Sequence, residues 1–91
     1  MAKSLQSDLP VHPGQLLAEE LEVREWTQKA LAAAMHRPAG VISSIIAGKK
    51  SITAETALQL ERVLGTPATL WIAKQGEYDL RLARQKLRTS A

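Results

Sequence analysis

The sequence predicts an all-α protein with one small domain. Ala and Leu are abundant, Phe is absent, and no stretch alternates apolar with polar residues for long. Apolar residues recur instead at three- and four-residue spacing, which is typical of amphipathic helices. The 91 residues are enough for one modest core of helix faces. We therefore expect five helices and no sheet, with the helices near residues 13–21, 28–35, 38–47, 54–64 and 68–87.

The first helix is expected to begin at Pro13, after a flexible N-terminal arm of residues 1–12. Proline suits a first helical turn because no amide hydrogen is needed there. Leu16, Leu17 and Leu21 follow at helical spacing and predict one buried stripe. We expect this helix to end near Leu21.

The second helix has a capping residue and an apolar staple at its start. The Thr27 hydroxyl can accept from a free amide of the next turn, and Trp26 can pack on Leu31. The third helix is expected to open at Pro38, directly after Arg37. Its apolar stripe consists of Ile42, Ile45 and Ile46, and it should stop at Gly48, where a left-handed residue has no steric cost.

Two more helices complete the domain, which is expected to span residues 13–88. Thr53 predicts the N-terminal cap of the fourth helix, and Gly65 its end. Trp71 and Tyr78 lie near one stripe of the fifth helix, where large aromatic residues usually pack in a core. That helix becomes basic at its end through Arg81, Arg84, Lys86 and Arg88. Whether this basic tail contacts DNA, a protein or only solvent stays open.

The composition excludes several classes of function. Without cysteine there is no disulfide scaffold, thiolate zinc site or thiol nucleophile. The two histidines, His12 and His36, are far apart in the sequence, so neither a metal site nor a catalytic pair is expected. We expect no enzyme activity and no cofactor. No signal peptide or membrane span is apparent, which favours a cytoplasmic protein.

Charge is distributed unevenly along the chain. Acidic side chains crowd the first helix, whereas no Asp or Glu occurs from Trp26 through Ala54. The basic residues of that stretch are Lys29, Arg37, Lys49 and Lys50. A surface of this kind suits contact with phosphates, although it is also compatible with an ordinary solvated face.

Within this cationic stretch, residues 28–45 form a helix-turn-helix pattern of two short helices joined by a turn. Leu31 and Met35 should face Ile42 and Ile45, while the small Ala32 lets the helices approach closely. The second helix of such a unit lies in the DNA major groove. Its outward residues would be Ala39, Gly40, Val41, Ser43, Ser44 and Ala47.

This unit resembles the helix-turn-helix of phage-repressor-like regulators, in which a Gln opens the first helix. Motifs on both sides narrow the resemblance: His12-Pro13-Gly14, Leu16-Leu17, Ala47-Gly48-Lys49-Lys50, Ile52-Thr53-Ala54-Glu55-Thr56-Ala57-Leu58, Leu64-Gly65-Thr66-Pro67, Leu70-Trp71, Gln75 and Tyr78-Asp79-Leu80. Over residues 11–83 the chain is similar to the HigA-type antitoxins of bacterial toxin-antitoxin modules.

The resemblance implies a five-helix lambda-repressor-like DNA-binding domain. A protein of this family would bind double-stranded operator DNA as a homodimer, repress its own operon and neutralise a RelE-like ribonuclease toxin. By position, Gln28, Lys49 and Lys50 match phosphate-contacting places. The base-facing places match Ala39, Gly40, Val41, Ser43 and Ser44.

The turn departs from the family pattern, which has Gly and then an apolar residue where this chain has His36 and then Arg37. Histidine tolerates positive φ, so the turn can form, and Arg37 would reach DNA or stay in solvent. The recognition helix is poor in hydrogen-bonding side chains. A repressor without a toxin and a protein-interaction module without DNA binding therefore stay open as alternatives, and either the last helix or the N-terminal arm is a candidate for the dimer interface.

Overall fold

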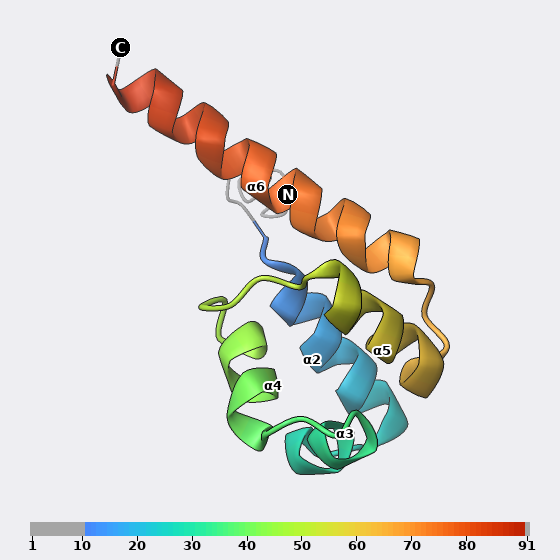
Figure 1. Ribbon diagram of the computed structural model, residues 1–91. Helices are drawn as coiled ribbons and strands as arrows, with labels where there is room; N and C mark the ends of the chain where they lie inside the picture. Colours follow the sequence, from blue (N-terminus) through green and yellow to red (C-terminus); the bar gives the residue numbers. More distant parts are fainter. Residues whose placement is uncertain (1–10, 91) are drawn as a thin grey trace.

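The computed structural model describes residues 11–90 and confirms the five-helix prediction (Figure 1). The helices are α2 (Pro13–Arg24), α3 (Gln28–Ala34), α4 (Ala39–Ile46), α5 (Ala54–Leu64) and α6 (Ala68–Ser90). No strand occurs among these described residues. Helices α2 to α5 form a bundle, and α6 crosses one side of the bundle and extends beyond it. The expected flexible arm lies, up to residue 10, outside the described residues.

The helix starts follow largely from local sequence. Thr27 Oγ1 accepts a hydrogen bond from the amide of Ala30 at 3.0 Å, and Thr53 Oγ1 accepts from the amide of Thr56 at 3.2 Å. Both predicted threonine caps are thereby confirmed. Pro38 is itself the N-cap of α4, so this helix begins one residue later than expected.

Helix α2 is longer than its apolar stripe. The prediction ended it at Leu21, but the structure continues to Arg24. The additional turn is mostly exposed, so the spacing of apolar residues could not predict that the helix continues. The helix ends where Glu25 adopts the left-handed conformation, with φ 56°, and its amide donates to the Glu22 carbonyl at 3.1 Å.

One apolar core joins all five helices. Its buried members are Leu17, Leu21, Leu31, Ala32, Met35, Ile42, Ile45, Ile52, Ala57, Leu60, Leu64 and Trp71. Trp71 is fully buried, which confirms the expectation that it belongs to the core. Burying one Leu, Ile or Met side chain stabilises a fold by about 1.5–3 kcal/mol, so the core supplies the main force that holds these short helices together.

The first turn of α2 packs directly on the end of α4. A Cβ atom built on Gly14 would lie 1.9 Å from the carbonyl oxygen of Ile45 and 2.8 Å from its carbonyl carbon. Neither atom belongs to a flexible side chain that can move aside. This close approach of two backbones therefore requires glycine at position 14.

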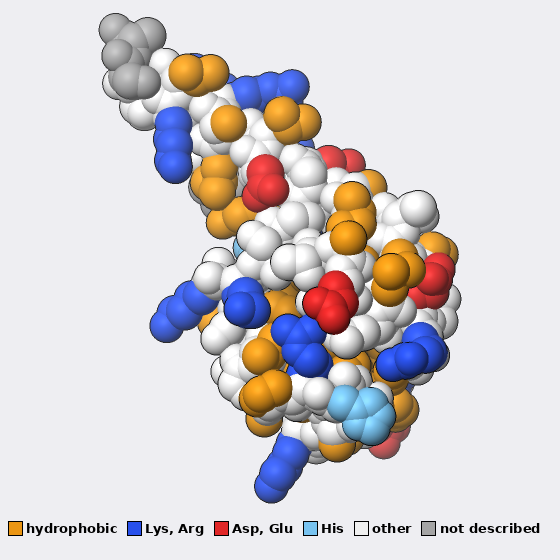
Figure 2. All heavy atoms as spheres, viewed as in Figure 1, with side chains coloured by type: hydrophobic (Ala, Val, Ile, Leu, Met, Phe, Trp, Pro, Cys, Tyr) orange, Lys and Arg blue, Asp and Glu red, His pale blue; other side chains and the backbone are white. Residues whose placement is uncertain are grey.

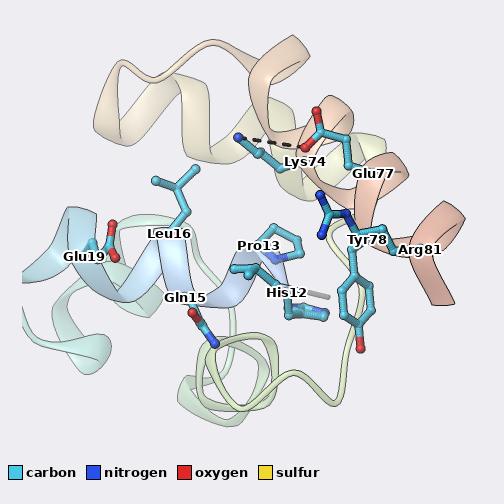
Figure 3. Close-up of a pocket in the computed structure, with 10 residues that line it drawn as sticks. His12, Pro13, Gln15, Leu16, Glu19, Lys74, Glu77, Tyr78 and Arg81 are labelled. Atoms are coloured by element: carbon cyan, nitrogen blue, oxygen red, sulfur yellow. Dashed lines mark ion pairs between the residues drawn. The ribbon is translucent and has the colours of Figure 1, made fainter. Parts of the chain in front are cut away.

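His12, which the sequence assigned to the flexible arm, is instead buried at the start of α2. Its Nδ1 accepts a hydrogen bond from the Gly14 amide at 2.9 Å. Its ring meets Tyr78 of α6 edge to face, with ring centres 4.7 Å apart, beside a hollow of about 400 Å³ between α2 and α6 (Figure 3). Burial lowers the pKa of His12 and outweighs the opposing effect of the Asp79 carboxylate.

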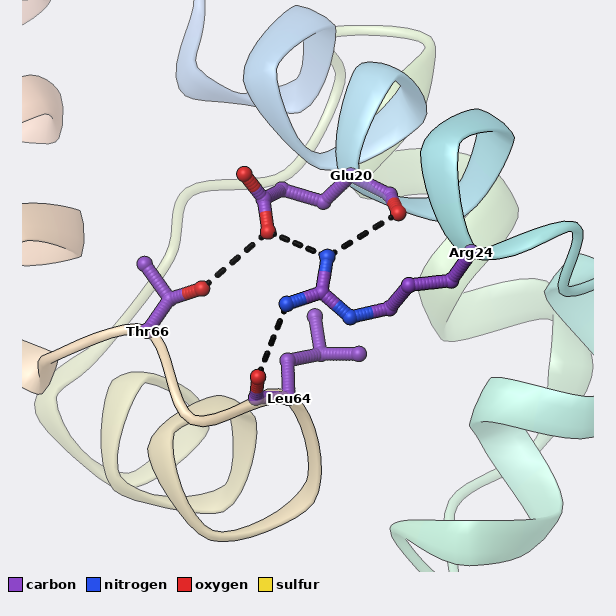
Figure 4. Close-up of polar contacts among 4 residues, drawn as sticks. All are labelled: Glu20, Arg24, Leu64 and Thr66. Carbon is purple, nitrogen blue, oxygen red and sulfur yellow. Dashed lines mark hydrogen bonds and ion pairs between the residues drawn. The ribbon is translucent and has the colours of Figure 1, made fainter.

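A polar cluster closes the other end of the bundle (Figure 4). Arg24 of α2 pairs with Glu20 one turn earlier and donates to the Leu64 carbonyl at 2.8 Å. Glu20 also accepts from the Thr66 hydroxyl at 3.2 Å. The guanidinium thus donates to a carbonyl at the C-terminal end of α5, where the last carbonyl groups have no hydrogen-bond donor within the helix. These contacts join α2 to the connection between α5 and α6.

Replacing Gly14 with Ala is expected to lower the free energy of unfolding by about 2 kcal/mol or more, because α2 and α4 must separate to admit the Cβ. Gly76 of α6 has no neighbouring atom within 4 Å of its Cβ position and is the matched control. Gly76→Ala should instead stabilise the helix by up to about 1 kcal/mol. Urea unfolding followed by circular dichroism measures both values. Equal effects of the two substitutions would contradict the close approach at Gly14.

Acidification is expected to weaken the fold through His12. The unfolded chain takes up a proton near pH 6.5, whereas folded His12 resists protonation, so unfolding becomes easier as pH falls through and below this value. His12→Asn keeps an N-cap acceptor that does not titrate, and should reduce the loss of stability between pH 7 and about 5.5. His36→Asn, at an exposed position, is the control and should leave this dependence intact. The assignment fails if His12→Asn keeps the full pH dependence of the parent.

Candidate nucleic-acid interface

A tight turn connects α3 to α4. His36 adopts positive φ, at 56°, as the sequence predicted for this position. The next amide, of Arg37, donates to the Ala32 carbonyl at 2.9 Å and closes the end of α3. This geometry ends one helix and redirects the chain into the next within a few residues.

The inner faces of α3 and α4 meet as the sequence predicted. Leu31 and Met35 on one side, and Ile42 and Ile45 on the other, are fully buried. Ala32 is only 2% exposed, consistent with a small residue where two helices approach closely. Since these faces are occupied by the core, only the opposite face of α4 is open to a ligand.

The outward face of α4 is small and mostly apolar. Ala39, Gly40 and Ser43 are exposed, whereas Ser44 is half-buried. Val41, which the sequence placed among the outward residues, is half-buried and packs against the core. Contacts available to this face are therefore hydroxyl hydrogen bonds, apolar contact with thymine methyl groups, and shape complementarity.

Polar and basic residues precede and follow α4 in the chain. Gln28 is exposed at the first position of α3, and Lys49 and Lys50 are exposed in the loop after α4. The loop leaves the helix at Gly48, whose φ is 80°, and the Lys49 amide donates to the Ser44 carbonyl at 2.9 Å. Figure 2 shows Lys or Arg side chains projecting at the left of the bundle, where the loop that follows α4 lies.

Gln75 of α6 anchors the loop that carries the two lysines. Its side chain is buried, its Oε1 accepts from the Ile52 amide at 2.8 Å, and its Nε2 donates to Asp79 at 3.0 Å. From the sequence, Gln75 is expected on the same stripe of the last helix as Trp71 and belongs to the family motif, but no inward hydrogen bond is predicted for it. A long polar side chain in the same helical stripe as Trp71 was the signal that it bonds inward.

Arg37 points toward α5. Its Nη1 donates to Gln59 Oε1 at 3.0 Å and contacts Thr56 Oγ1 at 3.5 Å, and the residue is half-buried. The sequence analysis considered contact with DNA or exposure to solvent for this residue. The structure shows a third arrangement, in which Arg37 links the turn to a helix far along the chain.

Residues 11–90 contain neither a cluster of three metal-ligating side chains nor a membrane-spanning helix. In this range no group of three His, Asp or Glu side chains is arranged to hold a metal ion. No helix in the same range has the length and apolar character needed to cross a membrane. The basic end of α6 lies at the opposite end of the molecule from α3 (Figure 1).

Comparisons with known proteins agree with this geometry. Residues 17–71 match the helix-turn-helix family model. The chain is 39% identical to virulence-associated protein I of Dichelobacter nodosus over 82 residues, which is 88% of this chain and 76% of that protein. Among solved structures, a HigA-family addiction module antidote protein from Coxiella burnetii is 36% identical, with a TM-score of 0.83 and 89% of both chains covered.

A second solved structure, the antitoxin HigA of Pseudomonas aeruginosa with the higBA promoter, is 32% identical. Its TM-score is also 0.83, and again 89% of each chain is covered. Proteins of this kind are not enzymes. The match of the family model to more than half of the sequence, together with these likenesses over nearly the whole length, shows that the chain belongs to the helix-turn-helix family and, within it, to the HigA-type antitoxins.

Proposed function

We propose that this protein is the antitoxin of a type II toxin-antitoxin module, which binds operator DNA through α3 and α4, represses its own operon and neutralises a RelE-like ribonuclease toxin. One observation carries the proposal. Along the chain, the open face of α4 lies between the exposed Gln28 and the exposed pair Lys49 and Lys50, on a stretch without a carboxylate. The likeness to an antitoxin solved with its promoter supports the same conclusion.

In this proposal α4 enters the major groove. Ala39, Gly40 and Ser43 meet the base edges, with Ser44 and Val41 at the margin of the contact because both are half-buried. The readout is then mainly apolar and shape-based, with few side-chain hydrogen bonds. Affinity comes largely from phosphate contacts made by residues outside α4.

Gln28, Lys49 and Lys50 supply those phosphate contacts. Gln28 begins α3, so its side chain and the neighbouring amides face the backbone of one strand. The two lysines follow the C-terminal end of α4, on a loop held by Gln75. Phosphate contacts from these two segments would fix the position of the recognition helix along the groove.

The DNA-bound protein is proposed to be a two-fold homodimer, because one short helix reads too few base pairs for a useful operator. The two recognition helices would lie about 34 Å apart, one turn of B-DNA. Leu80 and Leu87 on α6 are 55% and 71% exposed, and this apolar surface supports a role for α6 in the subunit interface. The N-terminal arm is the other candidate.

Replacing both Lys49 and Lys50 with Ala is expected to weaken binding to the duplex upstream of this gene and to a random duplex alike. Two lost phosphate contacts should reduce the slope of log affinity against log salt by roughly 2. Fluorescence anisotropy across a salt series measures both quantities. The matched control, Arg84→Ala with Arg88→Ala, removes the same charge from the far end of α6. If both double variants behave alike, the phosphate contacts lie elsewhere.

A toxin partner is expected to be encoded beside this gene. Co-expression of the adjacent reading frame with this protein should yield a stable complex and restore growth that the toxin alone arrests. Pull-down and colony counts provide the measurement. A neighbour that is harmless by itself, together with retained promoter binding, would favour a repressor without a toxin.

A further inference from the structure

We infer that Arg37 is a positioning residue of the DNA-binding unit, whose guanidinium fixes the start of the recognition helix against α5. The inference rests on the proposed function, because α4, the helix that Arg37 positions, is the helix proposed to bind DNA. It also assigns a role to Gln59, which the sequence analysis did not consider.

The other residues of the turn between α3 and α4 make few side-chain contacts. His36 is exposed and in the left-handed conformation, and Pro38 caps α4 without a side-chain hydrogen bond. Arg37 is half-buried, so its charged side chain must be held by polar partners.

Those partners lie on the first two turns of α5. Arg37 Nη1 donates to Gln59 Oε1 at 3.0 Å and lies 3.5 Å from Thr56 Oγ1. Thr56 is buried, and its hydroxyl also accepts a hydrogen bond from Thr53 Oγ1 at 3.1 Å. Thr53 Oγ1 is the oxygen that caps α5. The guanidinium therefore joins a hydrogen-bonded chain that includes the N-terminal cap of α5.

Hydrogen bonds from distant residues hold the chain at both ends of the recognition helix. The loop from α4 to α5 carries Lys49 and Lys50, and Gln75 holds that loop at Ile52. Arg37 holds the opposite end of α4 against the same helix, α5, into which the loop leads. Both ends of the short α4 are thus fixed relative to the lysines, so the spacing between base-facing and phosphate-facing groups is set before DNA arrives.

A positioning role and a direct phosphate contact predict different results. A phosphate contact depends on the charge of Arg37 and not on Gln59, and its loss lowers the salt dependence of binding. A positioning role depends on both side chains, because either substitution breaks the hydrogen bond between Arg37 and Gln59, while Gln59→Met leaves the contact of Arg37 with Thr56 in place. It leaves the salt dependence unchanged, since no phosphate contact is removed.

The test is a double-mutant cycle with Arg37→Met, Gln59→Met and the combination. Arg62→Met removes the same charge from an exposed position of α5 and is the matched control. Binding to the duplex upstream of this gene is measured by fluorescence anisotropy over a salt series. We expect Arg37→Met to lose about tenfold in affinity and Gln59→Met to lose less, because Thr56 can still accept from Arg37. The double variant should lose no more than Arg37→Met, and the salt slope should stay that of the parent.

Amide hydrogen exchange provides a readout that does not depend on DNA. Both single variants should exchange faster than the parent at Ala39–Ile46 and like the parent in α2 and α6, while Arg62→Met changes neither. The inference is overturned if Gln59→Met binds and exchanges like the parent, or if Arg37→Met lowers the salt slope by about one. If the parent binds neither this duplex nor a random one, the proposed function fails, and hydrogen exchange alone decides whether Arg37 holds the turn.

Discussion

Helix α4 must bury one face and leave the other open, and the rest of the structure depends on that constraint. It has eight residues, and a helix this short is not stable alone in water. Ile42 and Ile45 hold it to the core, and Gly14 allows α2 to reach its C-terminal end. The opposite face is free because these contacts all lie on one side. Stability of α4 and its availability to DNA therefore arise from the same packing.

Charge is separated along the sequence, although Glu19 and Glu22 of α2 line a hollow together with Gln28. The stretch without carboxylates carries α3, the turn, α4 and the lysine loop, whereas the acidic residues of α2 lie outside it. Arg24 and Glu20 of α2 are occupied with each other and with the end of α5. The basic end of α6 points away from α3, which separates it from the proposed DNA surface. A single duplex on α4 would thus meet cations from the loop and not from the tail.

Much of the fold could be predicted from the sequence because it depends on local chemistry. The caps at Thr27 and Thr53 and the positive φ at His36 each involve residues only a few positions apart, and apolar spacing identified the faces of α3 and α4. Contacts between distant residues were beyond such reasoning. The bond from Arg37 to Gln59 spans 22 positions and that from Ile52 to Gln75 spans 23. His12 was assigned to the arm because the Tyr78 ring that packs on it lies far along the chain.

The central claim, that α4 is the surface that meets DNA, is tested most directly by nuclear magnetic resonance. Amide signals of the protein are followed while the duplex upstream of its gene is added. The account predicts that the largest shifts gather at Ala39, Gly40 and Ser43 and in the loop at Lys49 and Lys50, with little change in the second half of α6. Shifts concentrated in α6, with the signals of α4 unmoved, would contradict it.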